Sequence, residues 1–191
     1  LDIPRAAQNL RFFAGAIQHE SQQVHTRTGF LNYTLQPPVG IGACISPWNL
    51  PLYLLTWKIA PALAAGNCVV AKPSEVTPYT AHCLGELVIE AGLPPGVLNI
   101  LHGLGDEVGT PLCEDRRVKA ISFTGSTRTG AHIARQSAAS FKKVSLEMGG
   151  KNAALIFADA YDSTAPASYR EHMMQTLIKA AFLNQGQICL C

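Results

Sequence analysis

The chain has 191 residues, of which 48% are hydrophobic and 15% are charged, so it can bury a sizeable core and wholesale disorder is excluded. Its formal net charge is +2 with both signs mixed along the sequence, which gives no electrostatic case for nucleic acid or an anionic membrane. Six cysteines lie too far apart for a disulfide scaffold or a paired zinc site. We therefore expect no metal and a reducing, cytoplasmic compartment.

Residues 4–20 begin the chain with a helical pattern, because apolar side chains recur there every three to four residues. Residues 29–47 are typical of extended structure, with a break between two strands at Pro37-Pro38. The most apolar stretch, 39–71, is interrupted by prolines, asparagines and a lysine, and this indicates a buried domain rather than a membrane span.

From residue 51 onward, predicted helices alternate with short strands that are apolar on both faces. Helices are predicted at 51–66, 77–92, 106–114, 126–139 and 167–182, and strands at 67–72, 96–101, 118–123, 142–148 and 152–157. This alternation favours a parallel sheet covered on both sides. The predicted fold class is therefore α/β, a doubly wound, Rossmann-like parallel sheet.

Two loops that follow predicted strands compete as phosphate-binding loops. The first, "HGLGDEVG", has a GxGxxxG spacing, but its Asp106 and Glu107 would repel a pyrophosphate. The second, "FTGSTRTG", follows a strand directly and opens a helix, with Gly125 freeing the turn and Ser126 offering a hydroxyl. Taken alone, it is more often an ordinary helix cap.

The chain closes on "FLNQGQICLC", with Cys189 and Cys191 one residue apart. Spacing alone leaves three interpretations open: a catalytic thiol, buried or tail cysteines, and a redox or metal-binding CxC pair with a histidine such as His172.

Four segments decide among these alternatives: "ISPWNLPLYLLTWKIAPALAAGNCVVAKPSE", "FTGSTRTG", "LEMGGKN" and "FLNQGQIC". In this order and approximate spacing, they resemble the aldehyde dehydrogenase superfamily over nearly the whole chain. The resemblance implies an enzyme that oxidises a small aldehyde to an acid with NAD, and a homo-oligomer, either a dimer or a tetramer.

The resemblance also assigns roles to three catalytic residues. Cys189 is the nucleophile, which forms a thiohemiacetal and then a thioester, whereas Cys191 is a neighbour at a variable position. Glu147 is the general base for thioester hydrolysis, although a lone strand-end carboxylate is more often simply solvated. Asn49 donates its side-chain amide to the oxyanion beside the backbone N–H of Cys189, although such an asparagine is more often a turn residue.

The cofactor residues follow from the same resemblance. Lys72 and Glu75 meet the adenosine ribose, and the Glu75 carboxylate favours NAD over NADP because it repels a 2′-phosphate. The alternative for this pair is a surface ion pair. The remaining positions are Ile45, Ser46, Pro47 and Trp48 on the nicotinamide-ribose side, Ser126 at the pyrophosphate, Gly105 near the adenine, and Ser74, Phe123 and Gly125 as further cofactor-binding residues.

The sequence departs from the family pattern in its length. The 159–184 connection is several residues longer than expected, and the chain starts at Leu1 and stops at Cys191. We expect a truncated fragment that is inactive alone; the alternative is a non-catalytic, nucleotide-binding or hetero-oligomerising form. The expected divisions are an N-terminal remnant (1–19), part of an oligomerisation segment (20–38), the NAD-binding domain (39–149) and the start of a catalytic domain (150–191).

Overall fold

A computed structural model of the chain describes residues 2–157 and 166–189. The chain divides into two compact units, Leu1–Glu147 and Met148–Cys191, and each is described by itself. Within the described ranges, no helix combines the length and the apolar character that crossing a membrane requires.

The first unit is built on a five-stranded sheet in the order β5-β4-β3-β6-β7. Strand β3 pairs in parallel with β4 and with β6, and β4 pairs in parallel with β5. The strands are β3 (Ile41–Ile45), β4 (Cys68–Lys72), β5 (Leu98–Ile100), β6 (Val118–Gly125) and β7 (Lys143–Met148). This order is that of a dinucleotide-binding half, so the predicted doubly wound α/β fold is confirmed.

Two helices cover each face of the sheet, because successive residues of a strand point to opposite sides. Helices α2 (Pro51–Ala64) and α3 (Tyr79–Glu90) pack on one face over a core that contains Cys44, Leu55, Ile59, Val69, Ala71, Ala81 and Leu84. Helices α4 (Thr110–Glu114) and α5 (Thr127–Ala138) pack on the other face over Ala43, Ile45, Cys113, Val118, Ile121, Phe123 and Ile133. The sheet is thereby a buried platform whose strand ends can present a site.

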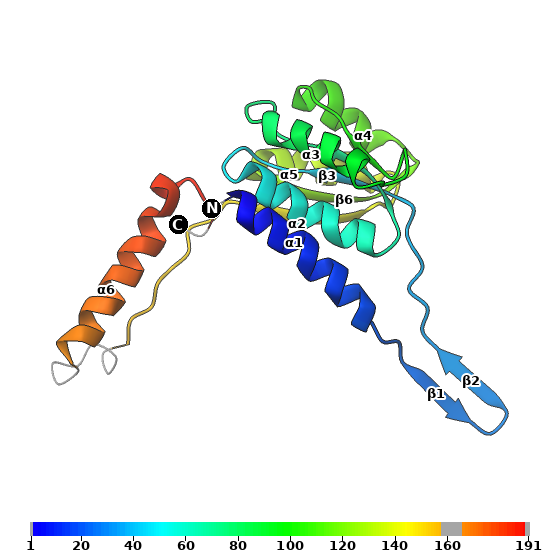
Figure 1. Cartoon of the computed structure of the whole chain (residues 1–191), viewed down its shortest axis with the longest axis horizontal. Helices are drawn as coiled ribbons and strands as arrows, with labels where there is room; N and C mark the ends of the chain where they lie inside the picture. Colours follow the sequence, from blue (N-terminus) through cyan, green and yellow to red (C-terminus); the bar gives the residue numbers. More distant parts are fainter. Residues whose placement is uncertain (1, 158–165, 190–191) are drawn as a thin grey trace. The chain divides into compact units, whose positions relative to one another are not determined.

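Helix α1 (Asp2–Ala16) lies alongside α2 (Figure 1). The Asp2 carboxylate accepts hydrogen bonds from the first backbone N–H groups of α2, those of Leu52 at 3.0 Å and Tyr53 at 2.9 Å. These N–H groups have no partner inside their own helix, so Asp2 caps α2 from another element. Farther along, buried Asn9 donates to the Tyr53 carbonyl at 2.9 Å.

An antiparallel hairpin of β1 (Val24–Arg27) and β2 (Phe30–Tyr33) follows the short 3-10 helix η1 (Ile17–His19). Gly29 sits in its turn at φ +80°, a left-handed conformation that favours glycine. All eight strand residues are exposed, and the hairpin extends away from the sheet (Figure 1). The hairpin belongs to the segment 20–38 that the sequence analysis assigned to oligomerisation.

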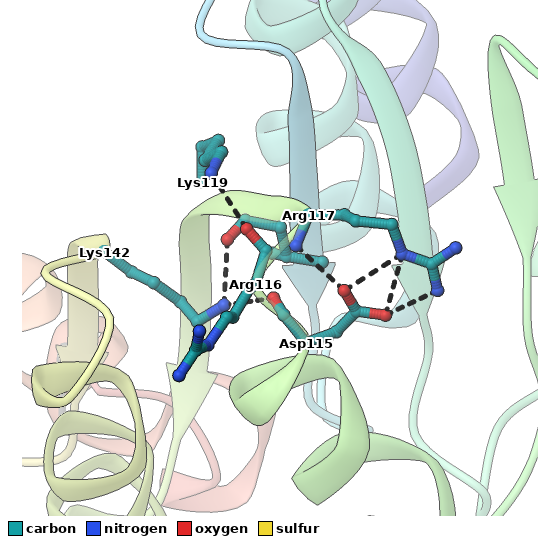
Figure 2. Close-up of polar contacts among 6 residues, drawn as sticks. Asp115, Arg116, Arg117, Lys119 and Lys142 are labelled. Atoms are coloured by element: carbon teal, nitrogen blue, oxygen red, sulfur yellow. Dashed lines mark hydrogen bonds and ion pairs between the residues drawn. The ribbon is translucent and has the colours of Figure 1, made fainter.

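A buried lysine fastens the start of β7 to the loop before β6 (Figure 2). The Lys142 ammonium donates to the carbonyls of Asp115 and of Val118, the latter at 2.8 Å. In the same loop, hydrogen bonds from Arg117 hold the pKa of the Asp115 carboxyl well below its usual range. Lys142 thereby joins β6 and β7 at their N-terminal ends, whereas the predicted site residues of both strands lie at the C-terminal ends.

The predicted helix at 106–114 is only partly correct. Residues Gly105–Gly109 form a π-helical turn, η2, and α4 begins at Thr110. The preceding Gly103 has φ +150°, and a Cβ there would lie 2.5 Å from the Val108 side chain. Gly103 is therefore required by the turn itself.

The predicted strand at 152–157 is wrong, because these residues form no strand and are exposed, with Leu155 81% accessible. The second unit's described elements are α6 (Ala167–Phe182), which confirms the last predicted helix, and the short η4 (Leu183–Gly186). Among the described residues, the second unit therefore offers no strand to pair with 152–157, and an apolar run without a partner strand does not form a ladder.

Candidate functional site

The point where the chain changes faces of the sheet lies between β3 and β6. Strand β3 leads into α2 on one face, and β6 leads into α5 on the other. In open α/β sheets, the carboxyl ends of the strands at such a switch point mark the crevice where ligands bind. Ile45 pairs with Lys72 on one side and with Phe123 on the other. Three of the residues predicted to bind the cofactor therefore form one row across three strands at this edge.

The loop after β3 continues the row with Ser46. Its backbone N–H donates to the Lys72 carbonyl at 3.1 Å, which holds the loop against β4. The Ser46 side chain is buried, and its hydroxyl has no hydrogen-bond partner among the described residues. A buried hydroxyl without a partner costs free energy, so Ser46 is suited to a polar ligand. Pro47 is half-buried, and Trp48 beside it is 47% exposed.

The loop after β6 brings Gly125 and Ser126 to the same edge. Ser126 is the N-cap of α5, and its hydroxyl oxygen accepts from the Thr129 N–H at 3.2 Å. Gly125 makes room for the buried Phe123 ring, since a Cβ at Gly125 would lie 2.5 Å from that ring. The ordinary cap that the sequence analysis weighed is thus present, and the helix end that it caps lies at the crevice, where anions bind favourably.

The end of β4 supplies Lys72, Ser74 and Glu75. The buried Lys72 ammonium donates to the exposed Glu75 carboxylate at 3.3 Å and to the Pro73 carbonyl at 3.2 Å. Hydrogen bonding to its own backbone N–H, with the nearby Lys72 charge, lowers the pKa of Glu75. Ser74 is buried, and its hydroxyl accepts from the Val76 N–H at 3.3 Å. Glu75 is therefore an oriented carboxylate whose accessible side can accept hydrogen bonds.

The loop with the GxGxxxG spacing adjoins this position. Gly109 faces the Lys72 side chain, and a Cβ there would lie 3.8 Å from it, which is ordinary van der Waals contact. Gly105 has open space on its Cβ side, with no heavy atom within 4 Å. Asp106 and Glu107 are exposed. The loop can therefore approach a ligand closely at Gly105, as the resemblance implies, while its carboxylates remain in solvent.

Glu147 lies at the end of β7, on the face that packs against α2. It shares this face with Lys143 and Ser145, because alternate residues of a strand point the same way. These two residues, the middle of β3 and β6, and Lys58 of α2 line a cavity of about 230 Å³. Glu147 itself is exposed at the strand end.

Lys58 is a residue that the sequence analysis did not select. It is only 6% exposed, and its ammonium donates to the Ser122 hydroxyl at 3.3 Å. Burial lowers the pKa of Lys58, an effect that the Cys44 and Glu147 charges oppose, whereas burial raises the pKa of the Cys44 thiol to about 12. Lys58 is thus a buried cation on the face of Glu147. A lysine inside the apolar helix 51–66 was the available signal.

Asn49 precedes α2 at the carboxyl end of β3. Its side-chain oxygen accepts from the Leu50 N–H at 3.1 Å, which is the contact of a turn residue, the alternative weighed for it from the sequence. The side-chain amide nitrogen is the donor that the predicted oxyanion role would use.

Cys189 belongs to the second unit and is exposed there as a free thiol. Asn184, Gln185 and Gly186 before it all adopt positive φ, at 52°, 58° and 71°. Asn152 donates its side-chain amide to the Cys189 carbonyl at 2.8 Å. Cys191 and residues 158–165 of the long connection lie outside the described residues. In the ranges 2–157 and 166–189, no three potential metal ligands gather.

Comparison with known proteins decides the family. The profile described as "Aldehyde dehydrogenase family" matches residues 1–191. This chain belongs to the aldehyde dehydrogenase family. Residues 46–67 and 184–191 resemble those of 2-aminomuconic semialdehyde dehydrogenases, and the chain is 53% identical to the one from Danio rerio and 51% identical to the one from Homo sapiens. Each match covers 100% of this chain and 38% of the relative.

Solved aldehyde dehydrogenase structures share the fold. The NAD+ complex of the enzyme from Bacillus cereus is 38% identical, with a TM-score of 0.90 over 98% of this chain and 37% of that one. The enzyme from Brucella melitensis biovar abortus 2308 is 34% identical, with a TM-score of 0.91 over 100% of this chain and 38% of that one. The chain thus spans less than two fifths of the length of these family members.

Proposed function

We propose that the whole protein, of which this chain supplies the cofactor-binding portion, oxidises an aldehyde to a carboxylic acid with NAD. The row formed by Lys72, Ile45 and Phe123 at the switch point carries the proposal, because it gathers residues of separate motifs at one crevice. The match to the aldehyde dehydrogenase family over residues 1–191 supports the same reaction.

The residues at the crevice fit a dinucleotide. The buried Ser46 hydroxyl, which has no partner in the part of the chain that the structure describes, offers a polar contact. The N-terminus of α5 at Ser126 suits a pyrophosphate, and the Glu75 carboxylate can accept from ribose hydroxyls. When bound, NAD supplies the hydride acceptor. The NAD+ complex of the Bacillus cereus relative supports the choice of this cofactor.

In the proposed reaction, the Cys189 thiolate attacks the aldehyde carbon and forms a thiohemiacetal, whose oxyanion accepts from the Asn49 amide. Loss of a hydride leaves a thioester on Cys189. Glu147 then takes a proton from water, which attacks the thioester carbon and releases the acid and the thiolate.

For the substrate, we propose a semialdehyde such as 2-aminomuconic semialdehyde. Identities of 51–53% to two dehydrogenases with this name support the choice, as compared with 42% to an acetaldehyde dehydrogenase from Pseudomonas aeruginosa. We also propose a reducing, cytoplasmic location, which the free cysteines of the described residues support.

The deciding experiment measures NADH formation by the whole protein with a muconic semialdehyde, a simple aliphatic semialdehyde and acetaldehyde. We expect the largest kcat/KM for the muconic compound. Oxidation of acetaldehyde alone would contradict the substrate class, whereas NAD binding without any NADH formation would favour the non-catalytic alternative.

Replacing Glu75 by glutamine should shift the cofactor preference towards NADP. The change removes the charge that would repel a 2′-phosphate, so we expect the ratio of kcat/KM for NADP to that for NAD to rise about tenfold or more. Glu86→Gln, at an exposed carboxylate on α3 that pairs with His82, is the matched control. An unchanged ratio in the Glu75 variant would remove Glu75 from the ribose site.

We further propose that the β1–β2 hairpin contacts another subunit in a homo-oligomer. Its strands leave large apolar side chains in solvent, with Phe30 74% and Leu31 61% exposed. Leu31→Glu should raise the subunit dissociation constant at least about tenfold, as measured by sedimentation of the whole protein. Ile89→Glu on α3, at a side chain that is 77% exposed, should leave assembly unchanged. Equal effects of the two changes would contradict the proposal.

A further inference from the structure

The Gly-Gly-Lys-Asn segment that follows Glu147 contacts the polypeptide next to the candidate nucleophile. The Asn152 side-chain amide donates to the Cys189 carbonyl at 2.8 Å, across 37 residues of sequence and within the second unit. A carbonyl oxygen only accepts, so the amide nitrogen of Asn152 must be the atom that faces it.

The turn before Cys189 lacks an intrinsic preference for the shape that it adopts. Asn184 and Gln185 carry Cβ atoms in the left-handed region, a conformation that is unfavourable for glutamine and better tolerated by asparagine. Inside the turn, Gln187 donates its N–H to the Asn184 carbonyl at 3.1 Å and its side-chain amide to Gln185 at 3.2 Å. These contacts stabilise the turn but do not reach Cys189.

We propose that Asn152 is a positioning residue for the Cys189 nucleophile, an inference that rests on the proposed function. By holding the Cys189 carbonyl, the Asn152 amide restrains the backbone of the cysteine and, with it, the direction in which the thiol leaves that backbone. Asn152 lies five residues after Glu147, so one stretch of chain carries the proposed base and orients the nucleophile.

The consequence is a specific pattern of loss. If the thiol is displaced, the protein still binds substrate and cofactor, but the sulfur reaches the aldehyde carbon less often. Small displacements of a reacting atom lower the rate strongly. The effect should therefore fall on the first chemical step rather than on KM for the aldehyde or on the dissociation constant for NAD.

The test uses Asn152→Ala and Asn152→Asp in the whole protein. We expect Asn152→Ala to slow the first turnover of NADH formation about tenfold, with KM for the aldehyde unchanged within about twofold. In Asn152→Asp, a near-isosteric carboxylate loses the donor and adds a negative charge. The pH profile for alkylation of Cys189 by iodoacetamide should therefore move to higher pH, because the charge disfavours the thiolate.

Asn99→Asp is the matched control, since Asn99 also donates its side-chain amide to a backbone carbonyl, that of Gly96 at 2.9 Å, on an exposed surface. It should leave both readouts at wild-type values. Alkylation is measured on the Cys189 peptide by mass spectrometry and needs no aldehyde, so it tests Asn152 even if the wild-type protein oxidises none. First-turnover and alkylation rates at wild-type values in both Asn152 variants would overturn the proposal.

Discussion

The Cys189→Ser variant of the whole protein should lose aldehyde oxidation by a factor on the order of 10⁴ or more. A serine hydroxyl is far less acidic than a thiol and is protonated at neutral pH, so it cannot form the adduct from which the hydride leaves. NAD binding should persist, because the residues proposed for the cofactor lie on β3, β4 and β6. Steady-state NADH formation and the change in Trp48 fluorescence on adding NAD measure the two properties separately.

Two other cysteines serve as controls for that experiment. Cys191→Ser alters the second thiol of the pair, which the family pattern treats as a variable neighbour, and Cys68→Ser alters an exposed thiol at the start of β4. Both variants should retain activity within about twofold. If Cys191→Ser lost as much activity as Cys189→Ser, the assignment of Cys189 as the sole nucleophile would be wrong, and Cys191 would be required as well.

The Glu147→Gln variant should separate the two halves of the reaction. Glutamine keeps the shape of the side chain but cannot take a proton, so hydrolysis of the thioester should slow about 10²–10³-fold while its formation stays near the wild-type rate. A burst of one NADH per active site, followed by a slow steady state, is the expected time course in the whole protein.

Glu90→Gln, at the exposed end of α3, provides the matched control and should leave both phases unchanged. Equal slowing of the burst and of the steady state in Glu147→Gln would show that Glu147 acts before the thioester forms. Glu147 would then be the base that deprotonates the Cys189 thiol rather than the base that deprotonates the hydrolytic water.

The elements that the sequence predicted well are those whose local pattern and tertiary role agree. Residues 68–71 are apolar because β4 is covered on both faces, and Gly66, at φ +79°, ends the helix before them. Gly125 and Ser126 could be placed at a helix entry because a serine cap has a local signature. The row of Lys72, Ile45 and Phe123 then follows from strand order, which the βαβ alternation nearly determines.

The features that were missed depend on partners distant in sequence. Asp2 caps α2 from about 50 positions away, so no local signal near Leu52 could reveal it. Lys58 acquires its character from burial beside Cys44 and Ser122, which only the packed sheet creates. The run 152–157 has the composition of a strand, yet strand formation depends on a neighbour that the described part of the second unit lacks.

Lys142 fixes the beginning of strand β7 through its two hydrogen bonds, an arrangement called the lysine lock below, and the proposed base Glu147 lies near the end of the strand. Strand β7 is one of the two edge strands of the sheet as described, and Lys142 ties its start to the carbonyls of Asp115 and Val118. An edge strand opens more readily than a central one, so amide hydrogen exchange along β7 reports directly on how firmly Glu147 is held. Removing the lock with Lys142→Met would accelerate that exchange, and on heating, activity would fade before the central strands β3 and β4 unfold.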